Sequence, residues 1–271
     1  MKRCLVIGGR GFIGSQIVND LVIRGYDVEI PERGDLSFFQ NSYDSIVYAA
    51  GYGICSKPVE LIESNILFFN EVLFKAKYKH LVYISSTRVY MSSPVASERS
   101  DIILPNEDER KLFNLSKLVS EETARLSGKN VTIVRPSNVY GTALNSNLFL
   151  PMIIKNAILN KSIDMYVEPS YEKDYISVED VSYFVRQCVE KGEEGFEIYN
   201  VAAGINISAE SIVKIIKRET QCKVNWHPGF VGEIFTPINI SKSKAMYVFE
   251  PKYLLSELPE IIASFKAALA K

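Results

Sequence analysis

The chain has 271 residues, of which 47% are hydrophobic and 23% charged, so it is long enough to bury one large core or a large domain with a smaller partner. Its formal net charge of -1 offers no electrostatic basis for binding nucleic acid or an acidic membrane surface. No apolar run approaches the roughly 20 residues that span a bilayer, and the first residues are typical of a strand rather than a signal peptide, which predicts a cytoplasmic protein.

The first predicted strand, residues 3–7, runs directly into a glycine-rich turn with Gly8, Gly11 and Gly14 spaced three apart. Gly8 permits a tight turn, Gly11 lets the backbone approach a pyrophosphate, and Gly14 lets the next helix pack close to the strand. An amphipathic helix over 12–24 and a strand over 27–30 follow. This context indicates a dinucleotide-binding turn, in which phosphates meet free N–H groups and the positive end of a helix dipole.

Strands and helices continue to alternate as far as residue 134. The pattern predicts strands over 45–50, 81–85 and 131–134, and helices over 58–77 and 107–127. Alternation of this kind builds a parallel sheet covered by helices on both faces, with ligands at the carboxyl ends of the strands. The predicted fold class is therefore α/β, with a Rossmann-type doubly wound parallel sheet.

After Pro136 the alternation loosens into loops and short elements. A helix is expected over 148–160, and a strand over 173–176, a helix over 178–189 and a strand over 196–200 are expected to return to the main sheet. Helices near 208–218 and 256–269 would close over the site. The predicted division is a dinucleotide-binding domain of 1–135 plus about 174–203, interleaved with a smaller C-terminal substrate lobe of about 136–173 plus 204–271.

The cysteines and histidines predict neither disulfides nor a metal site. The cysteines are far apart and mostly in apolar surroundings, which favours buried free thiols: Cys4, Cys55, Cys188 and Cys222. His80 and His227 are the only histidines, and they are too distant from each other in sequence to suggest a metal cluster, so we interpret both as structural or surface residues.

Several ordered motifs carry a family resemblance. Besides the glycine turn they are Asp35-Leu36, Ala49-Ala50-Gly51, Asn65, 85–90 (SSTRVY), 135–141 (RPSNVYG), 174–181 (DYISVEDV), 199–201 (YNV), and Ser241-Lys242 leading to 249–251 (FEP). Together they resemble, over nearly the whole chain, the extended short-chain dehydrogenase/reductases of the NAD-dependent epimerase/dehydratase group, which modify nucleotide sugars. The resemblance implies a nucleoside-diphosphate sugar as substrate and a nicotinamide dinucleotide as cofactor.

The resemblance also implies three catalytic positions. In this family a tyrosine exchanges a proton with the sugar while hydride moves to or from the nicotinamide; a lysine four residues later binds the nicotinamide ribose and lowers the tyrosine pKa; and a Ser or Thr hydroxyl polarises the reacting oxygen. Ser86 matches the hydroxyl position and Lys117 the lysine, but the tyrosine position is occupied by Phe113.

Phe113 departs from the family pattern, because a phenyl ring has no proton to give. A reaction that depends on general acid catalysis should lose roughly a factor of 10²–10⁴ by this change. Three explanations remain open: an engineered Tyr→Phe change, a natural variant in which Ser86, Tyr90, Tyr140 or a water donates the proton, or a protein that binds a nucleotide sugar without turning it over.

The resemblance places the cofactor along the glycine turn and the ends of the next strands. The residues implied are Gly8, Arg10, Gly11, Phe12, Ile13, Gly14, Glu32, Arg33, Asp35, Leu36, Ala49, Ala50, Gly51, Asn65, Lys117 and Pro136. Glu32 stands where a carboxylate accepts the adenosine 2′-hydroxyl of NAD. Arg10 and Arg33 would instead suit the 2′-phosphate of NADP, and the arginine inside the turn resembles the NADP-using GDP-fucose synthases. NADP(H) is favoured, and NAD stays open if Arg10 is solvated and Arg33 stacks on adenine.

The reaction type follows partly from Thr87-Arg88. Dehydratases of this family carry an Asp-Glu pair after the catalytic Thr, so the residues that follow Ser86 argue against dehydration. Reduction of a 4-keto sugar is favoured over 4-epimerisation, and the alternative from another class is a non-catalytic protein that binds NAD(P) and a nucleotide sugar.

Substrate contacts are expected from six positions: Ser86, Thr87, Asn138, Asn147, Leu148 and Lys173. An arginine that the family places near 228–230 is missing. The identity of the base and of the sugar cannot be inferred from these residues. The apolar faces of the predicted helices 58–77 and 107–127 resemble those that form a homodimer interface in this family.

Overall fold

The computed structural model describes residues 2–144, 146, 148–227 and 234–270. Its main sheet has the order β2-β1-β3-β4-β5-β9, and every neighbouring pair is parallel. The strands are β1 (Arg3–Ile7), β2 (Asp27–Glu29), β3 (Ser42–Tyr48), β4 (Lys77–Ile84), β5 (Val131–Pro136) and β9 (Phe196–Val201). The predicted α/β fold with a doubly wound parallel sheet is confirmed.

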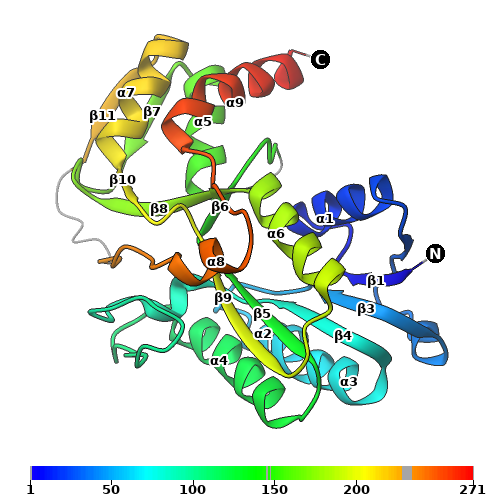
Figure 1. The fold of residues 1–271 in the computed structure, drawn as a ribbon. Helices are drawn as coiled ribbons and strands as arrows, with labels where there is room; N and C mark the ends of the chain where they lie inside the picture. The colour runs from blue at the N-terminus through cyan, green and yellow to red at the C-terminus, as the bar shows by residue number, and fades with distance from the viewer. Residues whose placement is uncertain (1, 145, 147, 228–233, 271) are drawn as a thin grey trace.

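Helices cover both faces of this sheet (Figure 1). One face is covered by α1 (Phe12–Ile23) and α6 (Val178–Lys191), the other by α2 (Pro58–Ile62), α3 (Phe68–Lys75) and α4 (Lys111–Leu126). Side chains alternate between the faces along each strand: Cys4 and Val6 of β1 pack in the cluster of α1 and α6, whereas Leu5 and Ile7 pack in the cluster of α3 and α4. Burial on both faces explains the apolar runs of these strands.

A smaller lobe with its own core lies beside the carboxyl ends of the strands (Figure 1). Its strands are β6 (Asn138–Tyr140), β8 (Glu172–Ser177) and β10 (Asn206–Ser208) in one sheet, and β7 (Ser162–Met165) and β11 (Lys223–Trp226) in another. Its helices are α5 (Phe149–Leu159), α7 (Ala209–Thr220) and α9 (Leu254–Leu269), whose apolar faces form the lobe core. The short α8 (Ser241–Met246) packs beside β9.

The strand predicted over 173–176 was wrongly expected to join the main sheet. β8 pairs with β6 and β10 instead, and β9 takes the place beside β5. The buried carboxylate of Asp174 explains the arrangement, because it accepts hydrogen bonds from the Ser137 hydroxyl and from the backbone N–H groups of Ala203, Gly204 and Ile205. Asp174 thereby ties together the three chain segments that pass between sheet and lobe.

The predicted helix 58–77 is interrupted and ends two residues early. A π-helical turn, η2 (Glu63–Leu67), separates α2 from α3, and β4 begins at Lys77. Two hydroxyls bind carbonyls within this turn: Tyr48 donates to Ser64 O and Ser120 to Asn65 O, each at 2.6 Å. Long-range partners therefore supply hydrogen bonds at the interruption, which the helical period of the sequence does not reveal.

The predicted helix 107–127 begins later, at Lys111, because Asp108 shapes a turn before it. The Asp108 carboxylate accepts the N–H of Arg110 and a bidentate ion pair from Arg88. Arg88 belongs to the 3₁₀ turn η3 (Thr87–Tyr90), and a further 3₁₀ turn, η1 (Ser37–Gln40), precedes β3. The start of α4 is therefore bound to the segment after β4.

The cysteines are free thiols, with Cys4, Cys188 and Cys222 buried and Cys55 partly exposed. His80 is buried and bonds Thr132, and the exposed His227 contacts Asp164, which confirms the interpretation of the histidines as structural or surface residues. None of the helices described here is both long and apolar enough to cross a bilayer.

Candidate active site

Two adjoining cavities open where the strand order of the main sheet reverses, between β1 and β3. The first has a volume of about 700 Å³ and lies over the turn after β1, and the second, of about 400 Å³, lies beside the ends of β4 and β5. Residues 49–52, which follow β3, line both. A long ligand can therefore extend from one cavity into the other.

The glycine turn leaves no room for a side chain at Gly8 or at Gly14. Gly8 has φ +82°, and a Cβ on it would lie 2.6 Å from Ala50 N; a Cβ on Gly14 would lie 2.1 Å from Gly8 O. Helix α1 starts after Gly11, and within the described chain no side chain caps that end. Uncapped N–H groups and the helix dipole suit the pyrophosphate of a dinucleotide, so these residues fit the predicted cofactor.

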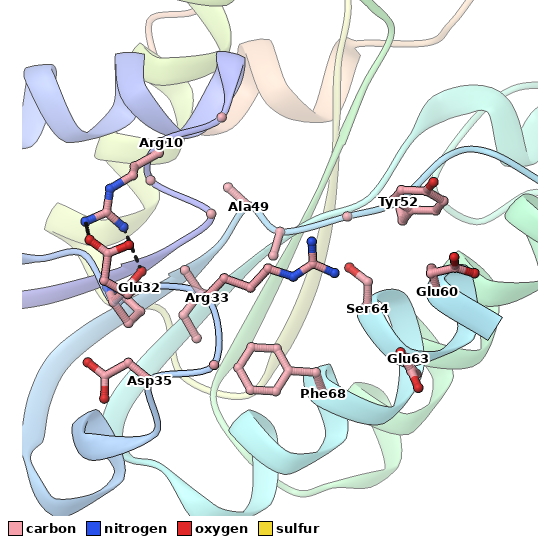
Figure 2. A pocket seen from close by; sticks show the side chains of 18 of the residues that line it. Arg10, Glu32, Arg33, Asp35, Ala49, Tyr52, Glu60, Glu63, Ser64 and Phe68 are labelled. Atoms are coloured by element: carbon pink, nitrogen blue, oxygen red, sulfur yellow. Dashed lines mark hydrogen bonds and ion pairs between the residues drawn. The ribbon is translucent and has the colours of Figure 1, made fainter. Parts of the chain in front are cut away.

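Charged side chains gather at the far end of the first cavity, where Figure 2 shows them. Arg10 pairs with Glu32 at 2.6 Å and also donates to Pro31 O at 3.1 Å, and both side chains are largely exposed. Arg33 extends across the cavity towards Ser64. Asp35 accepts the backbone N–H of Ser37, and this hydrogen bond lowers the pKa of the Asp35 carboxyl. Arg10 and Glu32, which the sequence presented as alternatives, are thus partners.

The helix after β3 contributes cavity residues that the sequence analysis missed. They are Glu60, Glu63, Ser64 and Phe68, together with Tyr52 from the loop before it (Figure 2). The predicted topology could have identified these residues, because in a parallel sheet the loop and helix after β3 start at the same edge as the glycine turn.

Asn65 lies outside both cavities and is completely buried. Its amide accepts the N–H of Tyr52 and donates to Tyr52 O and to the Ser116 hydroxyl at 2.8–3.0 Å. The side chain therefore holds the loop of residues 49–52 against α4, one layer behind the surface that a ligand would touch. Gly14 likewise packs against Gly8 and lines neither cavity.

The second cavity brings Ser86, Phe113 and Lys117 together. Ser86 caps η3, and its Oγ accepts the N–H of Arg88, so its hydroxyl hydrogen can be donated elsewhere. Lys117 donates to Ile84 O at 3.0 Å and to the Tyr83 hydroxyl at 3.3 Å. Burial lowers the pKa of Lys117 to about 8, against an opposing effect of Glu121. The Lys117 Nζ lies 5.9 Å from the centroid of the Phe113 ring.

Two tyrosines considered as substitute acids lie elsewhere. The Tyr90 hydroxyl bonds Arg135 and Asn200, and Tyr140 belongs to the core of the smaller lobe. Neither lines the second cavity as far as the described residues define it, whereas Ser86 does. Tyr52, which the sequence analysis did not consider, also lines it.

Of the expected substrate and cofactor positions, Phe12, Ile13, Thr87, Pro136, Asn138, Leu148 and Lys173 line the second cavity, and Asn147 lies outside the described residues. Asn138 donates to Asp174 O at 2.8 Å. The Lys173 ammonium lies over the rings of Tyr171 and Phe235, 5.0 and 4.8 Å from their centroids. Phe235 belongs to a loop far along the chain, and no motif in the sequence predicted its place in the cavity.

A buried charged network lies behind the second cavity. Glu121 of α4 forms an ion pair with Arg135 of β5 and accepts the Ser85 hydroxyl, and Arg135 also bonds Tyr90. These groups link α4 to the strand ends that carry Ser86. Among the described residues, no group of three or more His, Cys, Asp and Glu side chains is placed to hold a metal ion.

Comparison with known proteins agrees with this geometry. The model of the NAD dependent epimerase/dehydratase family matches residues 4–202. The dTDP-4-dehydro-6-deoxy-D-allose reductase of Streptomyces bikiniensis is 24% identical, covering 98% of this chain and 96% of the reductase.

Two solved structures show the same fold. MoeE5 in complex with UDP-glucose and NAD has a TM-score of 0.85 at 19% identity, covering 98% of this chain and 99% of MoeE5. A Tyr→Phe mutant of the UDP-glucuronic acid 4-epimerase from Bacillus cereus, in complex with NAD and UDP-4-deoxy-4-fluoro-glucuronic acid, has a TM-score of 0.83 at 19% identity, covering 98% and 99% of the two chains.

Proposed function

Because the chain belongs to the NAD dependent epimerase/dehydratase family, we propose that it is an NAD(P)-dependent oxidoreductase that reduces a nucleoside-diphosphate 4-keto sugar. The observation that carries the proposal is the pair of adjoining cavities, with the glycine turn in the first and Ser86 and Lys117 in the second. The reductase among the relatives supports this reaction.

The chain's own residues have distinct tasks in this reaction. The turn around Gly8 and the start of α1 would hold the pyrophosphate, and Lys117, fixed by Ile84 O, would bind the nicotinamide ribose. The dinucleotide, when bound, supplies hydride chemistry. Ser86 would donate a hydrogen bond from its hydroxyl to the reacting sugar oxygen. Asn138, Leu148 and Lys173 would contact the rest of the nucleotide sugar, with the ammonium of Lys173 facing the diphosphate.

We propose NADP(H) as the preferred cofactor. A 2′-phosphate can compete for Arg10, because the exposed pair of Arg10 with Glu32 is worth only about 0–1 kcal/mol. Arg33 already extends over the cavity and can add a second guanidinium. NAD binding by the structural neighbours makes NAD the alternative.

Phe113 favours one alternative function, binding of a dinucleotide and a nucleotide sugar without turnover. Its ring lines the second cavity at the position where the family uses a proton donor. This alternative predicts that the protein binds both the dinucleotide and the nucleotide sugar but does not convert the sugar.

The test is to measure NADPH and NADH oxidation with a panel of nucleoside-diphosphate 4-keto sugars, using the wild-type chain and Phe113→Tyr. We expect turnover in the wild type and a gain of up to about 10²–10⁴-fold in the variant, because tyrosine restores a general acid. A matched titration should show tighter binding of NADPH than of NADH, and Arg33→Ala should reduce that difference.

Two outcomes would contradict the reductase. Interconversion of nucleotide sugars without net oxidation of the cofactor would favour a 4-epimerase. Ligand binding without turnover in both proteins would favour the non-catalytic alternative. Equal affinity for NADPH and NADH would contradict the cofactor preference alone.

We also propose a homodimer and a cytoplasmic location. Exposed apolar side chains of α3 and α4 form a groove that a second copy would cover; it is lined by Phe74, Leu115, Leu118, Val119 and Leu126 with Glu122 and Thr123. The free cysteines are typical of a reducing compartment.

A further inference from the structure

Arg110 lies beside Phe113 in the second cavity, directly before the first turn of α4. Its guanidinium carbon is 4.8 Å from the centroid of the Phe113 ring, which is within the range of a cation–π contact. Arg110, Phe113 and Lys117 are spaced three and four residues apart, so they share the face of the helix that lines the cavity. The phenyl ring therefore supports a fixed positive charge beside the position where the family has its proton donor.

The loop after β3 lies against the same two groups. A Cβ placed on Gly53 would be 3.6 Å from Arg110 Nη2 and 3.9 Å from Phe113 Cε2. Gly53 and its neighbour Tyr52 both line the cavity. Arg110 and Phe113 thus lie between α4 and the loop that connects the cofactor end to the substrate end.

The charged side chains that line the second cavity, among the residues that the structure describes, are all basic. Among its described lining residues, Arg88, Arg110, Lys117 and Lys173 are basic and none is acidic. Arg88 forms a buried bidentate pair with Asp108, and Lys173 lies over the rings of Tyr171 and Phe235. Arg110 and Lys117 flank Phe113, at 4.8 and 5.9 Å from the centroid of its ring. A cavity of this kind stabilises negative charge that develops inside it.

From this juxtaposition, and resting on the proposed reduction, we propose that Arg110 is a catalytic residue that stabilises the oxyanion formed at the sugar carbonyl. Hydride, supplied by the reduced dinucleotide as it is oxidised, adds to the carbonyl carbon and moves the two π electrons of the C=O bond onto oxygen. The resulting alkoxide takes a proton from water, which leaves as hydroxide. Arg110 keeps its charge throughout, because a guanidinium is not deprotonated in proteins. It lowers the barrier by electrostatics, whereas the family's tyrosine does so by giving up a proton.

The double substitution tests this role, because restoring the tyrosine should make Arg110 dispensable. Steady-state kcat and KM are measured for Arg110→Gln, for Arg110→Lys, which keeps the charge, and for Arg110→Gln with Phe113→Tyr. Arg218→Gln on α7, an exposed arginine paired with Glu219, controls for loss of one positive charge. Calorimetric binding of the product nucleotide sugar and thermal unfolding are measured on every variant.

We expect Arg110→Gln to lower kcat by about 10²-fold with KM and product affinity within about threefold of wild type, as for removal of one oxyanion donor. Arg110→Lys should retain about a tenth of the activity or more. In the Phe113→Tyr background, Arg110→Gln should lower kcat less than about fivefold.

Other outcomes would overturn the role of Arg110. An equal loss in both backgrounds would make Arg110 a structural residue, and a rise in KM and in the product dissociation constant without a fall in kcat would make it a binding residue. Turnover only after Phe113→Tyr would leave the proposed reduction standing and remove Arg110 from catalysis. Absence of turnover in every protein would overturn the proposed function, and the role of Arg110 with it.

Discussion

At the scale of single residues, Lys117 and Phe113 determine what the second cavity can do. Lys117 is anchored on Ile84 O and the Tyr83 hydroxyl, so its position does not depend on a tyrosine at 113. Phe113 keeps an aromatic ring over the same helix face but removes the hydroxyl. The site therefore keeps an anchored lysine for the proposed cofactor contact and lacks a hydroxyl at position 113.

Lys117 should make cofactor binding depend on pH. Burial lowers its pKa to about 8, so the ammonium predominates below that pH and the neutral amine above it. Cofactor affinity should therefore fall as the pH rises through about 8, because a charge-assisted hydrogen bond to the ribose is weakened.

The measurement is a dissociation constant for NADPH between pH 6.5 and 9.5. Lys117→Met should bind about 10–100-fold more weakly at pH 7, which corresponds to a lost hydrogen bond from a charged group, and should lose the pH dependence. Lys111→Met, on the same helix but outside both cavities, should behave as wild type. An unchanged pH profile in Lys117→Met would assign the dependence to another group.

At the scale of elements, α4 connects the site to the sheet. Its buried face carries Asn114, Ser116, Lys117, Ser120 and Glu121, an unusually polar set for a helix that covers a sheet. Ser116 and Ser120 bond Asn65, and Glu121 bonds Arg135 of β5. These directional contacts fix the rotation of α4, and with it the direction of the cavity residues.

The neighbours Glu121 and Glu122 test how much the buried contacts of α4 stabilise the protein, because Glu121 forms a buried ion pair and Glu122 an exposed one. Glu121→Ala should lower the free energy of unfolding by about 3–5 kcal/mol, because it leaves the buried Arg135 without its carboxylate. Glu122→Ala breaks only an exposed pair with Arg125 and should leave the free energy of unfolding nearly unchanged. Urea unfolding of both variants gives the comparison, and similar losses would mean that the buried pair stabilises the protein no more than the exposed pair does.

At the scale of the whole molecule, the two lobes meet at the second cavity. The turn after β1 and the loop after β3 belong to the large sheet, whereas Asn138, Leu148 and Lys173 come from the segments that build the smaller lobe. The carboxylate of Asp174 holds the crossing segments together. The residues proposed to bind cofactor and substrate thus line one junction between the lobes.

The proposed homodimer belongs to this scale. Val119 is 43% exposed in the apolar groove of α3 and α4, so Val119→Glu should place a charge in the interface and yield monomers. Light scattering coupled to gel filtration measures the mass. Val22→Glu changes a valine of α1 that is 55% exposed, and it should leave the mass unchanged. A wild-type monomer at micromolar concentration would contradict the proposal.

The sequence by itself determined the α/β class and the glycine turn, because each depends on local spacing: a period of two or 3.6, or glycines three apart. Ser86, Phe113 and Lys117 were identified through the resemblance of their motifs to the family. Only the tertiary structure decided that Arg10 pairs with Glu32 and that Asn65 faces inward. It also decided that β8 lies outside the main sheet, and that Arg110 lies on Phe113 in a cavity lined by basic side chains. Most of these join residues well separated in the sequence. Arg110 and Phe113 are near neighbours in the sequence, but the cavity around them is formed by loops from distant parts of the chain. Sequence periodicity does not predict such packing.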